Sequence, residues 1–254
     1  MKKHIKIKNL WSNLYLPKEK TNEIVIGVHG FSGDKESSVL IALGEELNKN
    51  GIALITFDLP CHGENDNTKP INLKECENSI GTIFEYVKEN FKDIPISVFA
   101  TSFGAYLSLL YLSTHNEKLD KIILRAPAIF MDDTTKNTLF NDHHLTLADL
   151  ELPRNFGYKQ PLLADKTFVE DLENNNLDNA QPTPHFLYVL QGKKDNVVNP
   201  TENARFFDRH YPNNHKIIYF ENADHRFKNP GELERIIFET MSILQNQQTL
   251  QPDK

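Results

Sequence analysis

The alternation of strand-like and helix-like segments limits this chain to a narrow set of folds. Short apolar runs predict buried strands, and segments in which apolar residues recur three and four positions apart predict the helices between them. The expected strands are 23–30, 52–58, 95–100, 121–126, 185–192 and 215–221, and the expected helices are 37–50, 73–91, 103–115, 201–210 and 231–245. This order predicts a mostly parallel sheet with helices on both faces, whose active site lies at the carboxyl ends of the strands.

Two segments depart from this rhythm. Residues 3–16 alternate loosely and predict an antiparallel hairpin, which brings the expected sheet to eight strands. Residues 130–183 contain no convincing strand and only weak helical stretches such as 166–172. Because so long a structureless loop is improbable in a compact domain, we expect an α/β core at 1–129 and 184–254 with an inserted cap at 130–183.

The bulk properties exclude several classes of protein. A length of 254 residues suits one large α/β domain, and the net charge of -7 argues against a nucleic-acid partner. No apolar run is long enough to span a membrane, and the N-terminus lacks the apolar core of a signal peptide. Cys61 and Cys76 are too few for a disulfide framework, so we expect a cytoplasmic protein, with a homodimer left open.

The clearest local motif is Ala-Thr-Ser-Phe-Gly at 100–104, where a predicted strand meets a predicted helix. A nucleophile elbow needs a serine on such a turn, flanked by small residues, and usually reads Gly-x-Ser-x-Gly. Ala100 replaces the first glycine but is still small. The pattern makes Ser102 a candidate nucleophile, with a helix-capping serine as the simpler alternative.

A glycine-flanked loop, His-Gly-Phe-Ser-Gly at 29–33, follows the first long predicted strand. Acyl transfer needs backbone N–H groups aimed at the developing oxyanion. We assign this oxyanion hole to the N–H groups of Phe31 and Phe103, and expect His29 to be structural.

Two further polar residues follow the last two predicted strands. Asp195 lies in Gly-Lys-Lys-Asp-Asn after the strand at 185–192, and His225 lies in Ala-Asp-His-Arg-Phe after the strand at 215–221. Ser102, Asp195 and His225 therefore occur in the chain order Ser, Asp, His, each after a strand, as in α/β-hydrolases. This order decides in favour of a catalytic triad, and it makes Asp195 preferable to Asp132 or Asp133 as the acid.

The motifs resemble those of the α/β-hydrolase family over nearly the whole chain. The resemblance is greatest to small bacterial esterases of the cinnamoyl/feruloyl esterase and monoacylglycerol-lipase-like group. It rests on HGFSG at 29–33, FDLPCHGEN at 57–65, ATSFGA at 100–105, GKKDNVV at 192–198 and ADHRF at 223–227. The second motif usually reads Asp-x-x-Gly-x-Gly-x-Ser; here Cys61 replaces the first glycine and Asn65 the serine. The resemblance also implies a cap after the sixth strand.

Other polar residues receive structural interpretations. We expect Cys61 to be a small buried turn residue rather than a reactive thiol, and Asp58 and His62 to hold their loop together. The pair His143 and His144 has no companion ligand cluster at metal spacing, so neither a metal nor a cofactor is expected.

The combined pattern predicts a carboxylesterase-type serine hydrolase acting on small-molecule esters of small to medium acyl or aryl groups. A thioesterase, an acyltransferase or an aminopeptidase-like hydrolase would use the same triad; the last should gather acidic residues near the site. A catalytically silent ligand-binding protein of this fold would typically lack a triad member, whereas this chain keeps all three. Phe156, Tyr158 and Phe168 in the cap fit either an apolar pocket or the cap's own core, and we prefer the core.

Overall fold

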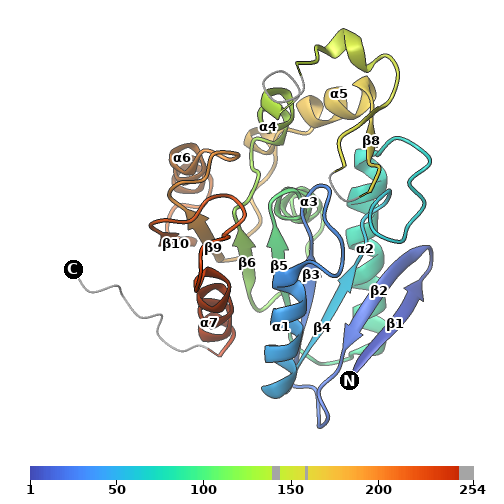
Figure 1. The fold of residues 1–254 in the computed structure, drawn as a ribbon. Coiled ribbons are helices and arrows are strands. Elements are labelled where there is room, and N and C mark those ends of the chain that lie inside the picture. Colours follow the sequence, from blue (N-terminus) through green and yellow to red (C-terminus); the bar gives the residue numbers. More distant parts are fainter. Residues whose placement is uncertain (139–143, 158–159, 246–254) are drawn as a thin grey trace.

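The computed structural model describes residues 1–138, 144–157 and 160–245. An eight-stranded sheet runs through this part of the chain in the order β1-β2-β4-β3-β5-β6-β9-β10 (Figure 1). In chain order its strands are β1 (Lys2–Ile7), β2 (Leu10–Tyr15), β3 (Glu23–Val28), β4 (Ile52–Phe57), β5 (Ile96–Thr101), β6 (Ile122–Arg125), β9 (Leu187–Gly192) and β10 (His215–Phe220).

The sheet is parallel except at its N-terminal edge. β1 pairs antiparallel with β2, and β2 pairs antiparallel with β4, so the predicted hairpin is present. β3 and β4 are buried along their whole length, as expected of central strands covered on both faces. The predicted mostly parallel eight-stranded sheet is confirmed.

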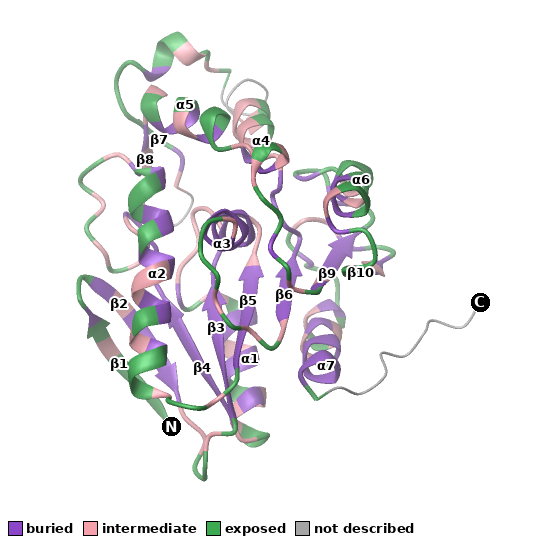
Figure 2. Cartoon of the chain, turned by 180° about the vertical axis from the view of Figure 1, so that it is seen from behind, coloured by how far each residue is buried: buried purple, intermediate pink, exposed green. Residues whose placement is uncertain are grey.

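Helices cover both faces of the sheet. α1 (Ser38–Lys49) and α7 (Glu232–Leu244) contact each other on one face, and α2 (Leu73–Asn90) and α3 (Phe103–Leu112) do so on the other (Figures 1 and 2). α6 (Pro200–His210) packs at the β9–β10 end. No helix in the described ranges is long and apolar enough to cross a membrane.

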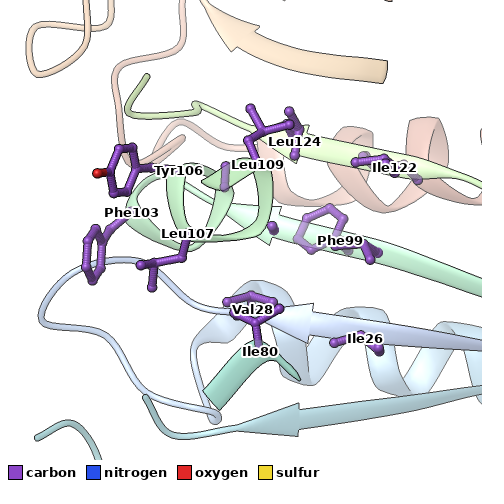
Figure 3. Packing of buried hydrophobic residues seen from close by; sticks show 14 of the residues in the cluster. Ile26, Val28, Ile80, Phe99, Phe103, Tyr106, Leu107, Leu109, Ile122 and Leu124 are labelled. Carbon is purple, nitrogen blue, oxygen red and sulfur yellow. The ribbon is translucent and has the colours of Figure 1, made fainter. Parts of the chain in front are cut away.

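Every residue of α3 is buried, which sets it apart from the amphipathic helices around it. Figure 3 shows its side chains among those of the neighbouring strands, with Phe103 and Tyr106 at one end of the cluster. A helix that is apolar all round belongs in the interior. The first turn of α3 is therefore held rigidly against the sheet, next to the end of β5.

The described elements of the segment 130–183 are α4 (Met131–Asn137), η2 (Leu147–Leu150), β7 (Arg154–Asn155), β8 (Leu163–Ala164), α5 (Lys166–Asn174) and η3 (Leu177–Asn179). The described part of the segment up to α5 lies above the carboxyl ends of the strands, and η3 then runs beside α3 toward β9 (Figure 1). The helix predicted at 166–172 is present as α5. The expectation of no strand was wrong in one detail, because β7 and β8 form a small antiparallel pair. Two residues per strand are too few to show an alternating pattern in the sequence.

Candidate active site

Ser102 is the single residue that turns the chain from β5 into α3. Its backbone has φ 50° and ψ -115°, a conformation that costs a non-glycine residue about 1–3 kcal/mol. The Ser102 N–H donates to the carbonyl of Arg125 at 2.9 Å, and its carbonyl accepts from the N–H of Ala128 at 3.2 Å. The neighbouring strand end thus holds the serine in its strained turn.

The glycine and the alanine of the motif play different parts. A Cβ on Gly104 would lie 2.4 Å from the carbonyl oxygen of His29, so only glycine lets α3 approach the end of β3 this closely. Ala100 is a fully buried residue of β5, and its Cβ is accommodated there. The turn therefore requires glycine at the fifth position of the motif but not at the first.

The three residues predicted as a triad lie in one hydrogen-bonded row. Ser102 Oγ is 3.0 Å from His225 Nε2, and His225 Nδ1 is 2.9 Å from Asp195 Oδ2. Because a carboxylate only accepts, Nδ1 carries the proton, and Nε2 is left to accept from the serine hydroxyl. The His225 side chain is 16% exposed, whereas that of Asp195 is fully buried.

The loop carrying Asp195 is fastened to the loop carrying His225. The Lys194 N–H donates to the carbonyl of Ala223 at 3.0 Å. A Cβ on Gly192 would come within 2.4 Å of the same carbonyl oxygen. Close backbone packing therefore sets the distance between the acid and the imidazole.

Arg125, the last residue of β6, supports the His225 loop from below. Its guanidinium donates to the carbonyl of Arg226 at 2.8 Å and lies 4.5 Å from the ring centre of Phe227. Burial lowers the pKa of Arg125 to about 10, so the group keeps its positive charge at neutral pH. The sequence analysis did not select Arg125. The one available sign was its position, as a charged residue at the end of an apolar strand.

Phe31, in the 29–33 loop, and Phe103, the first residue of α3, lie next to the serine. Their rings are 5.7 Å apart, and a Cβ on Gly30 would lie 3.2 Å from Ser102 Cβ, so the 29–33 loop passes directly beside the serine. Within the described residues, the N–H groups of Phe31 and Phe103 have no hydrogen-bond acceptor. Both remain available to an oxyanion.

Two buried histidines brace the 29–33 loop. His29 Nδ1 bonds to the carbonyl of Gly30 at 2.8 Å, and its Nε2 accepts from the Leu59 N–H. His62 Nε2 accepts from the N–H of Ser32 at 3.1 Å. Burial lowers the pKa of His29 to about 4 and that of His62 to about 3, which keeps both rings neutral as these bonds require. His29 is not part of the Ser102–His225–Asp195 row.

The 58–65 loop has a buried charge at its centre. The Asp58 carboxylate accepts from the backbone N–H and the ammonium group of Lys35, each at 2.8 Å, and from the Glu64 N–H at 2.9 Å. Asn65 donates to the Asp58 carbonyl at 2.7 Å. Cys61 adopts φ 63°, the left-handed conformation for which glycine is usual, and burial raises the pKa of its thiol to about 11. Such a thiol is protonated and poorly nucleophilic at neutral pH.

The other candidate residues are not part of the Ser102–His225–Asp195 row. Asp132 is 3.5 Å from the side chain of Asn176, whereas Asp133 lines a cavity of about 440 Å³. That cavity also reaches Asp195 and the exposed Glu202 of α6. His143 and Tyr158 lie outside the residues that the structure describes. Within the described ranges, no three potential metal ligands lie together.

Comparison with known proteins places the chain in a family. The model of the family described as serine aminopeptidase, S33, matches residues 19–188, more than half of the chain. The matched region includes Ser102 and ends before Asp195 and His225. No curated protein sequence matches the chain.

Solved structures of low sequence identity share the fold. Est1E from Butyrivibrio proteoclasticus with bound ferulic acid has a TM-score of 0.77 at 18% identity, covering 96% of this chain and 98% of that one. Monoglyceride lipase from Saccharomyces cerevisiae with a substrate analog has a TM-score of 0.74 at 14% identity, covering 98% and 96%. A thermostable carboxyl esterase from Bacillus coagulans has a TM-score of 0.74 at 15% identity, covering 97% and 98%. The architecture is thus that of an α/β-hydrolase.

Proposed function

Because the chain belongs to the serine aminopeptidase S33 family of α/β-hydrolases, we propose that it hydrolyses carboxylic esters of small to medium acyl or aryl groups through Ser102, His225 and Asp195. The observation that carries this proposal is the unbroken hydrogen-bonded row, with Ser102 Oγ 3.0 Å from His225 Nε2 and His225 Nδ1 2.9 Å from Asp195 Oδ2. Such a row turns a weakly nucleophilic hydroxyl into an effective nucleophile.

The reaction proceeds in two acyl-transfer steps. His225 removes the hydroxyl proton as Ser102 attacks the ester carbonyl, and the imidazolium then protonates the departing alcohol. Water, deprotonated by the same imidazole, next attacks the acyl-enzyme. The imidazolium then returns the proton to Ser102 Oγ as the acyl–oxygen bond breaks, which releases the carboxylic acid. Asp195 keeps the Nδ1 tautomer of His225 in place throughout and stabilises its positive charge.

The N–H groups of Phe31 and Phe103 stabilise the tetrahedral anion in both steps. Three observations support this role: the 29–33 loop passes beside Ser102, Phe103 follows Ser102 directly, and neither N–H has an acceptor within the described residues. Removing one such donor typically lowers kcat by about 10²–10³.

Residues 130–183 act as a cap over this site. The place of α4 and α5 above the carboxyl ends of the strands supports this assignment (Figure 1). Phe156 and Phe168 are buried within the apolar cluster, which favours a packing role for them over lining an acyl pocket.

The proposal is tested with p-nitrophenyl esters of increasing acyl length, together with acyl thioesters, on the wild type and on Ser102→Ala. We expect ester turnover that falls by several orders of magnitude in Ser102→Ala. Ser79→Ala, which removes another buried serine hydroxyl on α2, is the matched control and should turn over esters at the wild-type rate. Undiminished turnover by Ser102→Ala would reject the proposal, and a preference for thioesters would change the substrate class.

Aminopeptidase activity is the second candidate, because acidic groups gather beside the acid of the row. Asp133 and Glu202 line the same cavity as Asp195, and neither has an ion-pair partner within the described residues. Carboxylates in that position suit the free amine of an N-terminal residue.

The test is cleavage of aminoacyl p-nitroanilides with free and with acetylated amines. Cleavage of the free-amine form alone, lost in Asp133→Asn with Glu202→Gln, would favour the peptidase over the esterase.

A further inference from the structure

Two buried side-chain amides stand behind Asp195 and have no part in the mechanism described above. Gln191, at the end of β9, is 1% exposed, and Asn203, on α6, is 2% exposed. Gln191 Nε2 donates to Asp195 Oδ2 at 3.2 Å, and Asn203 Nδ2 donates to Gln191 Oε1 at 3.0 Å. Asn203 Nδ2 also donates to the carbonyl of Pro127 at 2.9 Å.

The orientation of both amides follows from the group at the far end. The carbonyl of Pro127 can only accept, so the amide nitrogen of Asn203 must face it. The same nitrogen meets the carbonyl oxygen of Gln191, which leaves the Gln191 nitrogen pointing toward Asp195. The chain of bonds therefore delivers a donor, not an acceptor, to the carboxylate.

This chain of bonds closes on the nucleophile. Pro127 is followed by Ala128, whose N–H donates to the carbonyl of Ser102 at 3.2 Å. The contacts therefore form a ring. It runs from Ser102 through His225, Asp195, Gln191 and Asn203 to Pro127, and the next residue, Ala128, bonds back to Ser102. The ring connects the acid to the serine through groups from the loop after β6, from β9 and from α6.

The two carboxylate oxygens of Asp195 accept hydrogen bonds from different groups. Its Oδ1 accepts from the N–H groups of Val197 and Val198, each at 2.9 Å. Its Oδ2 accepts from both His225 and Gln191. Without Gln191, the imidazole of His225 would be the remaining side-chain donor to Oδ2.

We propose that Gln191 and Asn203 are positioning residues that hold Asp195 Oδ2 on the Nδ1–H of His225. The inference rests on the proposed function, since it assigns a role to groups that act on the triad. The hydrogen bond from Gln191 also stabilises the negative charge on Asp195 Oδ2. It therefore weakens the electrostatic attraction between the carboxylate and the imidazolium of His225. Removing it should leave the imidazole misaligned and more readily protonated.

The test is Gln191→Met, which keeps the length of the side chain and removes its donor. We expect kcat for a p-nitrophenyl ester to fall about tenfold, the equivalent of one lost hydrogen bond to a charged group, with KM within twofold. The acidic limb of the kcat/KM profile should move to higher pH. Asn203 contacts Asp195 only through Gln191, so Asn203→Ser should lower kcat by about threefold and move the acidic limb in the same direction by a smaller amount. This variant provides the test if Gln191→Met does not fold.

Asn13→Leu is the matched control, because it removes a buried amide that bonds to Glu36 at the other end of the sheet. It should cost stability without moving the pH limb. A wild-type kcat and pH limb in folded Gln191→Met and Asn203→Ser would overturn the positioning role. Undiminished activity in Ser102→Ala or Asp195→Asn would instead overturn the proposed function itself, so the two failures are distinguishable.

Discussion

At the scale of single residues, His29 and His62 show how burial commits a titratable group to one protonation state. Each ring accepts a backbone N–H through Nε2, from Leu59 and Ser32 respectively, and a protonated ring has no lone pair to do so. His29 is the first residue of the loop that carries the Phe31 N–H, and His62 bonds to Ser32 of the same loop. Their protonation therefore opposes both the fold and the proposed oxyanion hole.

The free energy of unfolding should fall as the pH drops from 6.5 toward 4. The pKa values of His29 and His62 in the folded protein are about 4 and about 3, below the ordinary 6.5, so the unfolded chain binds more protons in this interval. Each histidine then contributes a slope of up to about 1.4 kcal/mol per pH unit. Urea unfolding at pH 7, 6 and 4.5 measures the effect.

His62→Gln provides the internal comparison, since a glutamine supplies an acceptor without titrating. Its unfolding free energy should depend on pH less steeply than that of the wild type below pH 6.5. Equal slopes in the two proteins would show that the acid sensitivity comes from other groups.

At the scale of elements, the contact between the start of α3 and the end of β3 sets the geometry around Ser102. Gly104 permits this contact, because a side chain there would collide with the carbonyl of His29. The same contact places the first turn of α3, including the Phe103 N–H, beside the 29–33 loop. The glycine therefore acts on the site through the placement of a whole helix.

Gly104→Ala should lower esterase kcat/KM by at least tenfold, because α3 or the 29–33 loop must move to relieve the collision. Gly231→Ala is the control: Gly231 has φ 83° but open space around it, so alanine there costs only backbone strain. We expect the control to lose some thermal stability and to keep its kcat/KM. Equal activity in both variants would mean that the α3–β3 contact does not position the site.

The elements themselves were largely predictable, and the deviations have local causes. β3 and β4 are continuous apolar runs, so their sequences identify them directly. α3 ends at Leu112 rather than at the predicted His115, where the hydroxyls of Ser113 and Thr114 bond to carbonyls of the last turn. Such side-chain bonds compete with helix continuation and are not visible in apolar spacing.

At the scale of the whole molecule, one of the contacts between the 130–183 segment and the core is an aromatic cluster beside the candidate site. Phe168 of α5 is 1% exposed, and its ring centre lies 6.1 Å from that of Phe31 and 6.2 Å from that of Phe103. These are the two residues whose N–H groups are assigned to the oxyanion. The proposed cap and the proposed oxyanion hole thus share a packing contact.

Phe168→Ala should lower both stability and turnover. Truncating a buried phenylalanine costs about 3–5 kcal/mol, and the gap would leave Phe31 without its stacking partner. Phe84→Ala on α2 removes an equally buried ring that stacks on Tyr111. It should lose comparable stability in urea unfolding but keep kcat at a temperature where both variants are folded; parallel losses of kcat would refute a specific link between α5 and the site.

The chain order and strand-end positions of Ser102, Asp195 and His225 were enough to predict that they meet, because parallel strands end at one edge of the sheet. Arg125 and Gln191 also lie at strand ends, but nothing in the sequence near them or near Asn203 indicated which groups they contact. Their partners lie as far as 101 positions away, and an arginine in a strand or an asparagine in a helix is common on surfaces. The residues proposed to act on a substrate left a pattern in the sequence, whereas the residues that contact them are identified by long-range contacts.

Labelling with a fluorophosphonate, followed by peptide mapping in a mass spectrometer, tests the central claim most directly. An activated serine attacks the phosphorus and keeps the adduct, so the wild type should carry one label, on Ser102. His225→Ala should be labelled far more slowly, and Ser79→Ala as fast as the wild type. Absence of an adduct on Ser102 in the native protein, or labelling that does not depend on His225, would contradict the account.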